Sequence, residues 1–160
     1  SAVRRQGEIQ AGQPEVQIID YQTQQYRLLP GLARCIAFIT AAETVRSMTE
    51  NCFKGLAHGN SELLADLHNL SCGLKAVVTN QSSQSIDQAR QACGGHGYSD
   101  ASYMPTLFTS AIAACTYEGE NIVMLLQLAK YLMKAMAKID GSSEELGVLM
   151  QYLKNEKSSK

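Results

Sequence analysis

The sequence predicts an all-α fold, an antiparallel four-helix bundle whose long helices are joined by short connections. Apolar residues recur at spacings of three and four over long stretches, which is the period of an amphipathic helix. Alternation at period two is nowhere sustained, and β-branched residues do not cluster as they do in strands. With 160 residues, 45% of them hydrophobic, the chain is large enough for one domain with its own core.

The first long helix is expected between residue 18 and about residue 58. Pro14 precedes this apolar run and Gly59 follows it, as start and stop signals do. Pro30 lies inside the run. Because proline removes a backbone donor and clashes with the preceding turn, we expect a kink there or two shorter helices. The amino-terminal residues, which include Arg4 and Arg5, look like the last turns of an earlier helix.

Cap and glycine signals place the remaining helices. Asn60 and its neighbours can cap a second helix that runs to about Cys93, where a glycine-rich turn ends it. Its serine-rich second half is expected to meet either solvent or a partner. A short helix at residues 107–113 and a strong one at residues 119–139 follow, with a last one possible at residues 143–153. We expect one domain over residues 1–160, with a core of residues 1–139 and a peripheral helix and frayed tail over residues 140–160.

Composition excludes several classes of protein. The net charge is -1, which gives no electrostatic case for binding nucleic acid or an anionic membrane. No apolar run reaches the roughly 18 residues needed to span a bilayer. The five cysteines are scattered and form no CxxC pair, so neither a disulfide framework nor a zinc site is indicated, and no metal is expected.

A carboxylate, Glu118, stands beside Gly119 where an apolar, helix-forming run begins. Acids favour helix N-termini because the helix dipole and the free N–H groups stabilise negative charge, so Glu118 and Glu120 could both be capping residues. Alternatively, one carboxylate faces a buried pocket and abstracts a proton there, with Tyr117 as an apolar wall. Local chemistry alone favours the capping interpretation.

Two further segments have both a structural and a functional interpretation. Gly94 and Gly95, with the nearby Gly97, permit positive φ and the close approach of a ligand, although alone they are more typical of a helix terminus. No strand precedes them, so they are not a dinucleotide-binding fingerprint. Arg4 and Arg5 are either a solvated helix end or a phosphate site, because an Arg fork suits the paired oxygens of a pyrophosphate.

Four motifs in order resemble the carboxyl-terminal helical region of the acyl-CoA dehydrogenase and oxidase superfamily. Residues 2–6 look like its Arg-x-Gln/Thr-Phe-Gly segment, although Gly7 stands where Phe is usual. Residues 20–26 are similar to its acid-x-Gln helix start, and residues 91–98 to its Gln-x-x-Gly-Gly-x-Gly-Tyr/Phe motif. Residues 117–119 resemble its Tyr-Glu-Gly catalytic turn. The resemblance extends from residue 2 to about residue 137.

The particular residues in these motifs favour the peroxisomal acyl-CoA oxidase branch, and therefore a peroxisomal location. Dehydrogenases of the superfamily usually follow Tyr-Glu-Gly with Thr and then a Gln-x-x-Arg helix. Here Glu120 and Asn121 follow instead, and residues 92–98 are close to the oxidase form. Because family members carry further domains, the chain looks like a part of a longer flavoenzyme that is inactive by itself.

The resemblance implies a role for each motif. Glu118 would be the catalytic base that removes the α-proton of an acyl-CoA, with Tyr117 and Gly119 beside it in the substrate site. An oxidase of fatty-acid β-oxidation passes the β-hydrogen to FAD as hydride, forms trans-2-enoyl-CoA and reduces O2 to H2O2. The implied FAD-binding residues, shared across a homodimer interface, are Arg4, Gln6, Gln22, Gln91, Gly94 and Gly95.

Two alternatives stay open beside the oxidase. A dehydrogenase of the same superfamily would pass its electrons to an electron-transfer flavoprotein rather than to O2. A non-catalytic helical interaction module would keep the bundle and lose the activity.

Overall fold

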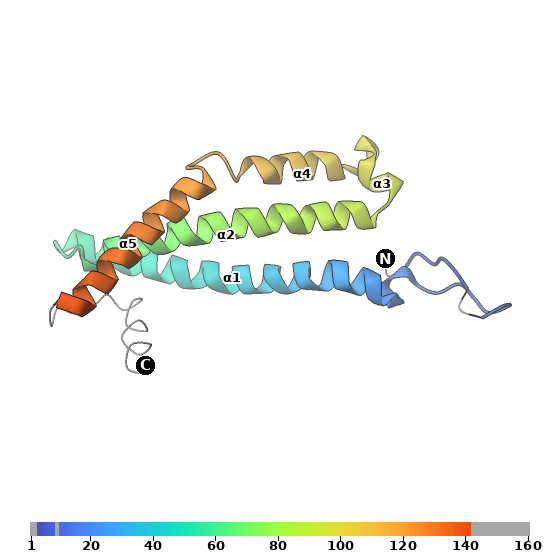
Figure 1. Cartoon of the computed structure of the whole chain (residues 1–160), viewed down its shortest axis with the longest axis horizontal. Helices are drawn as coiled ribbons and strands as arrows, with labels where there is room; N and C mark the ends of the chain where they lie inside the picture. The colour runs from blue at the N-terminus through green and yellow to red at the C-terminus, as the bar shows by residue number, and fades with distance from the viewer. Residues whose placement is uncertain (1–2, 9, 142–160) are drawn as a thin grey trace. The chain divides into compact units, whose positions relative to one another are not determined.

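The computed structural model describes residues 3–8 and 10–141, and in this part of the chain the regular elements are all helical (Figure 1). They are η1 (Ile18–Asp20), α1 (Gln22–Ala57), α2 (Glu62–Ala92), α3 (Gly95–Tyr98), η2 (Asp100–Ser102), α4 (Met104–Ala113) and α5 (Asn121–Gly141). The predicted all-α fold is confirmed. The helix expected at residues 143–153 and the polar tail lie outside the described residues.

The helix boundaries follow from local signals in the sequence. Asn60 Oδ1 accepts a hydrogen bond from the backbone N–H of Glu62 at 2.9 Å, so Asn60 caps α2 as expected. Gly59 adopts a φ of 80°, which only glycine takes without strain, at the end of α1. The 36 residues of α1 continue through Pro30 without a break. The alternative of two shorter helices is therefore wrong.

The chain divides into two compact units. The first contains Ser1–Ala37 and Gln81–Ala113, and the second contains Phe38–Asn80 and Ala114–Lys160. Each unit includes one half of α1 and one half of α2, and within each unit these two segments run antiparallel (Figure 1).

In the first unit, the amino-terminal segment is extended, which corrects the expectation of a helix end. The backbone N–H of Gln6 donates to the carbonyl of Val16 at 2.9 Å, and that of Ile18 to the carbonyl of Arg4 at 2.9 Å. Arg5 and Gln17 form an antiparallel bridge between the two stretches. These bonds join residues ten or more positions apart, so helical periodicity could not reveal them.

The same segment explains why glycine replaces the usual Phe at position 7. Gly7 has a φ of 84°, and a Cβ there would lie 2.6 Å from Tyr21 Oη. The Tyr21 hydroxyl itself donates to the carbonyl of Gln6 at 2.8 Å. The Tyr21 side chain therefore occupies the space that a Phe side chain would need.

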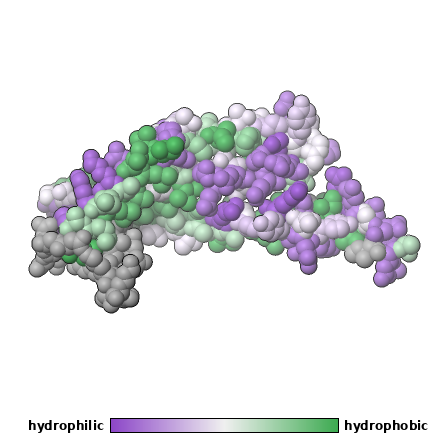
Figure 2. All heavy atoms as spheres, viewed as in Figure 1, coloured by the Kyte–Doolittle hydropathy of each residue, from purple (hydrophilic) through white to green (hydrophobic). Residues whose placement is uncertain are grey.

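A polar interface joins α1 to α2 in the first unit. Arg34 Nη1 donates to Ser85 Oγ at 3.2 Å, and Gly31 lets the Ser85 side chain approach α1 closely. Ser83 is only 2% exposed. Figure 2 shows hydrophilic residues gathered over the second half of α2. The serine-rich half of α2 therefore has α1 of its own chain as its partner, one of the two possibilities that its polarity left open.

In the second unit, α5 crosses the first half of α2 (Figure 1). Leu128 of α5 lies so close to Gly73 that a Cβ there would be 2.9 Å from its Cδ2 atom. The Tyr131 hydroxyl donates to the carboxylate of Asp66, which is 5% exposed. Burial, the hydrogen bond to Asp66 and the negative charge of Asp66 together raise the pKa of Tyr131 to about 12, with burial the largest cause.

Large apolar side chains remain exposed along α1. In the first unit they are Leu29, Leu32 and Ile36, and in the second unit they are Ile39, Phe53 and Leu56. By length and composition, α1 alone among the described helices could cross a bilayer, with a window of mean hydropathy 1.4. This corrects the expectation that no run is long enough. A single such helix is weak evidence for a span, because helices that pack inside large proteins pass the same test.

Candidate active site

The predicted catalytic residue Glu118 lies in the turn that leads into α5. Glu118 adopts a φ of 55° and Gly119 a φ of 98°. The backbone N–H of Asn121 donates to the carbonyl of Cys115 at 3.1 Å and closes the turn. A left-handed conformation costs a residue with a side chain about 1–2 kcal/mol. Such strained positions are enriched at active sites, where the surrounding structure holds them.

The two neighbouring carboxylates have different roles. Glu120 Oε2 accepts hydrogen bonds from the backbone N–H groups of Ile122, at 2.8 Å, and Val123, at 3.3 Å. Glu120 therefore caps the amino terminus of α5, where the dipole also favours its charge. Glu118 lies outside this cap. The capping interpretation, which the sequence left open for both residues, holds for Glu120 alone.

The glycine of the predicted catalytic turn is required by the packing of the turn itself. A Cβ at Gly119 would lie 2.5 Å from Met124 Cε and 3.0 Å from Met124 Sδ. The positive φ of Gly119 would strain any other residue as well. Two independent constraints thus fix glycine after Glu118.

A cluster of polar side chains on α2 forms hydrogen bonds with the turn and with Asn121 after it. Lys75 Nζ donates to the carbonyl of Gly119 and, at 2.9 Å, to Asn121 Oδ1. Asn121 Nδ2 in turn donates to Thr79 Oγ1 at 3.0 Å and to the carbonyl of Ala76 at 3.3 Å. Sequence reasoning missed Lys75 and Thr79, because they stand more than 40 positions before the turn. Their four-residue spacing on one helix face was the only available signal.

The buried pocket expected around Glu118 is not formed by the described residues. Glu118 is exposed, and Tyr117 is 54% exposed. Within this domain both side chains are therefore accessible from outside.

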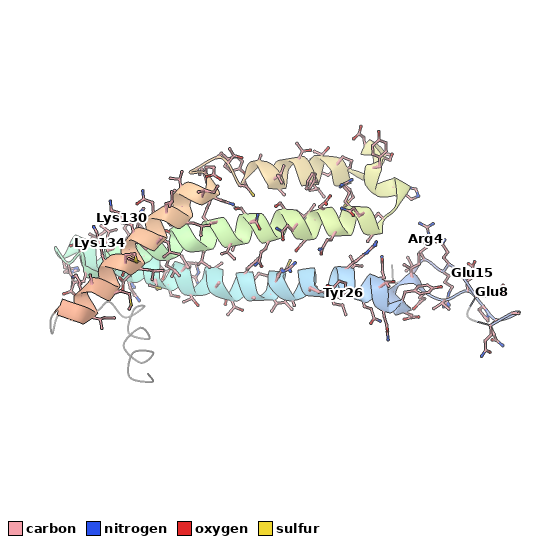
Figure 3. All side chains as sticks on the ribbon, in the orientation of Figure 1. Arg4, Glu8, Glu15, Tyr26, Lys130 and Lys134 are labelled. Carbon is pink, nitrogen blue, oxygen red and sulfur yellow. The ribbon has the colours of Figure 1, made fainter. Side chains whose placement is uncertain are left out.

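The first unit brings two of the predicted cofactor residues together. Gln22, at the start of α1, and Gln91, at the end of α2, line one open pocket of about 640 Å³ with Thr23, Tyr26, Arg27 and Gln88. Tyr26, labelled in Figure 3, lies on the first half of α1. Gln91 Nε2 also donates to Asp87 Oδ2 at 2.6 Å, which holds the amide at the pocket rim.

The glycine-rich turn after α2 has two kinds of glycine. A Cβ at Gly97, which is buried, would lie 1.8 Å from the carbonyl oxygen of Arg90. Gly94 and Gly95 would place a Cβ in open space, and Gly94 has a φ of 60°. The packing of the chain therefore explains Gly97, and the backbone conformation explains Gly94. Neither explains Gly95.

Arg90 braces this corner of the first unit. Its guanidinium lies 5.3 Å from the centre of the Phe108 ring of α4 and donates to Asp87 Oδ1 at 3.1 Å. Asp87 thus binds both Arg90 and Gln91, a role that the sequence analysis did not assign. Arg4 and Gln6 lie in the extended amino-terminal segment of the same unit, with the Arg4 side chain exposed (Figure 3).

These arrangements define a helical domain with an exposed carboxylate on a strained turn and a polar, glycine-rich corner. The sequence profile described as "Acyl-CoA oxidase, C-alpha1 domain" matches residues 1–133. The chain therefore belongs to the acyl-CoA oxidase C-alpha1 domain family. The predicted oxidase resemblance is confirmed.

Curated relatives are oxidases of greater length. The chain is 75% identical over 153 residues to the probable acyl-coenzyme A oxidase acox-1.5 of Caenorhabditis elegans, covering 96% of this chain and 23% of the relative. It is 42% identical over 153 residues to peroxisomal acyl-coenzyme A oxidase 1 of Mus musculus, with the same coverages of 96% and 23%. The chain thus spans about a quarter of the length of these relatives.

Solved structures share the fold. Acyl-CoA oxidase-1 of Caenorhabditis elegans, complexed with FAD and ATP, is 52% identical with a TM-score of 0.87 over 94% of this chain and 23% of that one. Acyl-CoA oxidase-2 of the same organism, bound with FAD, ascaroside-CoA and ATP, is 49% identical with a TM-score of 0.88 and the same coverages of 94% and 23%. The helical domain predicted from the sequence is therefore that of acyl-CoA oxidases.

Proposed function

We propose that this chain is the helical, FAD-contacting domain of a longer peroxisomal acyl-CoA oxidase, with Glu118 as the catalytic base. The observation that carries the proposal is that Glu120 caps α5 whereas Glu118 lies outside this cap. Because Glu120 caps α5, the turn has no structural need for a carboxylate at position 118. An unneeded carboxylate held in a left-handed conformation favours a role in chemistry.

In this function Glu118 takes the α-proton of an acyl-CoA thioester, and the product is trans-2-enoyl-CoA. The backbone N–H of Glu118 would bind the thioester carbonyl and stabilise the negative charge that develops on its oxygen. Bound FAD would supply the hydride acceptor for the β-hydrogen and the route of the electrons to O2, which yields H2O2. Glu118 is exposed in this domain, so the apolar walls of the site come from the rest of the full-length protein.

Features of the first unit fit a dinucleotide cofactor. Gly94 and Gly95 leave the backbone open to close approach, and the amides of Gln22 and Gln91 line one pocket. The exposed guanidinium of Arg4 suits the paired oxygens of a pyrophosphate, and Gln6 follows on the same segment. These residues would contact the FAD of a partner subunit in a homodimer. The solved relatives that hold FAD support this assignment.

The peroxisome is the proposed location, because relatives from mouse and rat are named peroxisomal acyl-coenzyme A oxidase 1. Fatty-acid β-oxidation is the corresponding process. Co-fractionation of the full-length protein with peroxisomal marker enzymes would support this location, and recovery with mitochondria would contradict it.

The decisive experiment changes Glu118→Gln in the full-length protein. We expect the rate of anaerobic FAD reduction by acyl-CoA to fall by roughly 10² to 10⁴-fold, because the amide cannot accept the α-proton. Glu120→Gln is the matched control, since it makes the same change of charge two residues away and retains an oxygen that can cap α5. Equal reduction rates for Glu118→Gln and the unmodified protein would remove Glu118 as the base.

The electron acceptor separates the oxidase from its alternatives. Consumption of O2 with one H2O2 released per enoyl-CoA is the expected result for an oxidase. Reduction of an electron-transfer flavoprotein without H2O2 would indicate a dehydrogenase instead. Absence of enoyl-CoA under both conditions would indicate a non-catalytic module.

A further inference from the structure

We propose that Lys75 is a positioning residue that sets the orientation of Glu118 through the carbonyl of Gly119 and the side chain of Asn121. The inference rests on the proposed role of Glu118 as the base. Lys75 lies on α2, and its ammonium group donates to two oxygen atoms of the turn. It therefore acts on the backbone that carries Glu118.

The conformation of the turn has an energetic cost. Glu118 and Gly119 are consecutive residues with positive φ, and Glu118 pays a steric cost for it. A turn of this kind persists only where neighbouring groups determine it from outside. The bond between Asn121 N–H and the carbonyl of Cys115 closes the turn but does not involve the Gly119 carbonyl.

Lys75 fixes the direction of the Gly119 carbonyl. If the Gly119 carbonyl rotated away, the part-buried ammonium group of Lys75 would lose one of its two partners in the turn. The peptide between Glu118 and Gly119 and the one after Gly119 share the Gly119 Cα atom. Fixing the direction of the Gly119 carbonyl therefore restricts the backbone from which the Glu118 side chain extends.

Residues of α2 hold the side-chain amide of Asn121 with hydrogen bonds to both its oxygen and its nitrogen. Asn121 accepts from Lys75 with Oδ1 and donates with Nδ2 to Thr79 Oγ1, at 3.0 Å, and to the carbonyl of Ala76, at 3.3 Å. Thr79 Oγ1 donates in turn to the carbonyl of Lys75 at 2.8 Å. Three residues of α2 thus determine the place of Asn121, and with it the start of α5.

The test uses the full-length oxidase, loaded with FAD, and the variant Lys75→Met, which keeps the length of the side chain and removes its donors. The limiting rate of anaerobic FAD reduction at saturating acyl-CoA should fall at least tenfold per bound FAD. The dissociation constant for acyl-CoA should change less than threefold, because Lys75 acts on the base and not on the bound substrate. Lys75→Arg, which can donate to the same oxygens, should recover part of the limiting rate.

Lys134→Met is the control, because Lys134 is exposed and lies in the second half of α5, away from the turn (Figure 3). It should leave the limiting rate unchanged. Thr79→Val serves if Lys75→Met does not fold, since it removes one hydroxyl at nearly constant shape. Its expected effect is a loss of about threefold in the limiting rate.

The outcomes separate this proposal from the one on which it rests. An unchanged limiting rate in Lys75→Met, or in Thr79→Val where only that variant folds, would overturn the positioning role, even if the melting temperature falls. A lowered rate in these variants together with an inactive Glu118→Gln supports both proposals. A fully active Glu118→Gln would remove the base itself and, with it, the reason for positioning.

Discussion

The Glu118 turn and the glycine-rich corner after α2 both depend on glycine, but for different reasons. In the turn, Gly119 is required from within, because its φ of 98° strains any other residue and the end of Met124 would have to move away from a Cβ. In the corner, Gly97 is required from within because a Cβ would clash with the Arg90 backbone, whereas a Cβ at Gly95 would meet no atom within 4 Å. A glycine with no other part of the described chain nearby is what the proposed close approach of FAD would require. Contacts within the domain and the backbone conformation explain the glycine of the turn, whereas no contact within the domain explains Gly95 in the corner.

The largest expected effect comes from the contrast between Gly97→Ala and Gly95→Ala. The methyl group at position 97 would clash with the Arg90 backbone at 1.8 Å, so the backbone itself must move. We expect a loss of about 3 kcal/mol or more in the free energy of unfolding for this variant. Thermal melting followed by circular dichroism measures it.

Gly95→Ala should stay within about 0.5 kcal/mol of the unmodified protein, since nothing in the chain meets the added methyl group. In the full-length protein it should nevertheless lower the FAD content after purification. Normal FAD content in Gly95→Ala would contradict the proposed contact between Gly95 and FAD, and with it the contrast between the corner and the turn.

The next effect concerns the turn. Gly119→Ala adds a methyl group 2.5 Å from Met124 Cε and forces a residue with a side chain into a φ of 98°. The far end of Met124 can move, so we expect a moderate loss of about 2 kcal/mol, mostly from the backbone. The double variant Gly119→Ala with Met124→Ala separates the two terms. Full recovery in the double variant would show that packing, not φ, selects glycine.

The smallest effect concerns the anchor of α5 and depends on pH. Burial and Asp66 raise the pKa of Tyr131 from 10.0 to about 12, so the folded protein keeps the phenol proton more tightly than the unfolded chain does. The resulting stabilisation is complete below pH 10 and is lost as the pH rises from about 10 to about 12. Because Tyr131 is only partly buried, solvent screens this interaction, and the loss should be about 1 kcal/mol.

Unfolding by denaturant between pH 9 and pH 12 measures this loss. Tyr131→Phe provides the comparison, because it lacks the titrating hydroxyl and should show a weaker dependence on pH over this range. Equal slopes for the two proteins would contradict the assignment of the raised pKa to Tyr131.

Much of the fold could be predicted because its signals are local. The cap at Asn60 and the glycine at position 59 are visible in a few residues of sequence, and α2 starts and ends within two residues of the prediction. The extended amino-terminal segment could not be predicted, because its hydrogen bonds join residues 4–7 to residues 16–18. Pro30 does not divide α1, since the helix continues past it on an exposed face, and the kink stays a prediction.

The candidate site shows the same limit. The motif that contains Glu118 is contiguous, so the sequence could place the carboxylate and the glycine beside it. The roles of Lys75 and Thr79 depend on the packing of α2 against a turn more than 40 positions away, and no local pattern encodes that. The sequence also could not show which of Glu118 and Glu120 caps the helix, because both stand at the start of the same helix. The hydrogen bonds of Glu120 settled which residue caps α5.

The cap provided by Glu120 has a consequence for how this domain can evolve. Since folding depends on one carboxylate and the proposed chemistry on the other, a single mutation can silence the enzyme without unfolding it. Glycine at position 118 would even relieve the strain of a φ of 55°. Gene duplicates could therefore lose the base early and persist as stable scaffolds, so descendants of such a domain should diverge at position 118 sooner than at position 120.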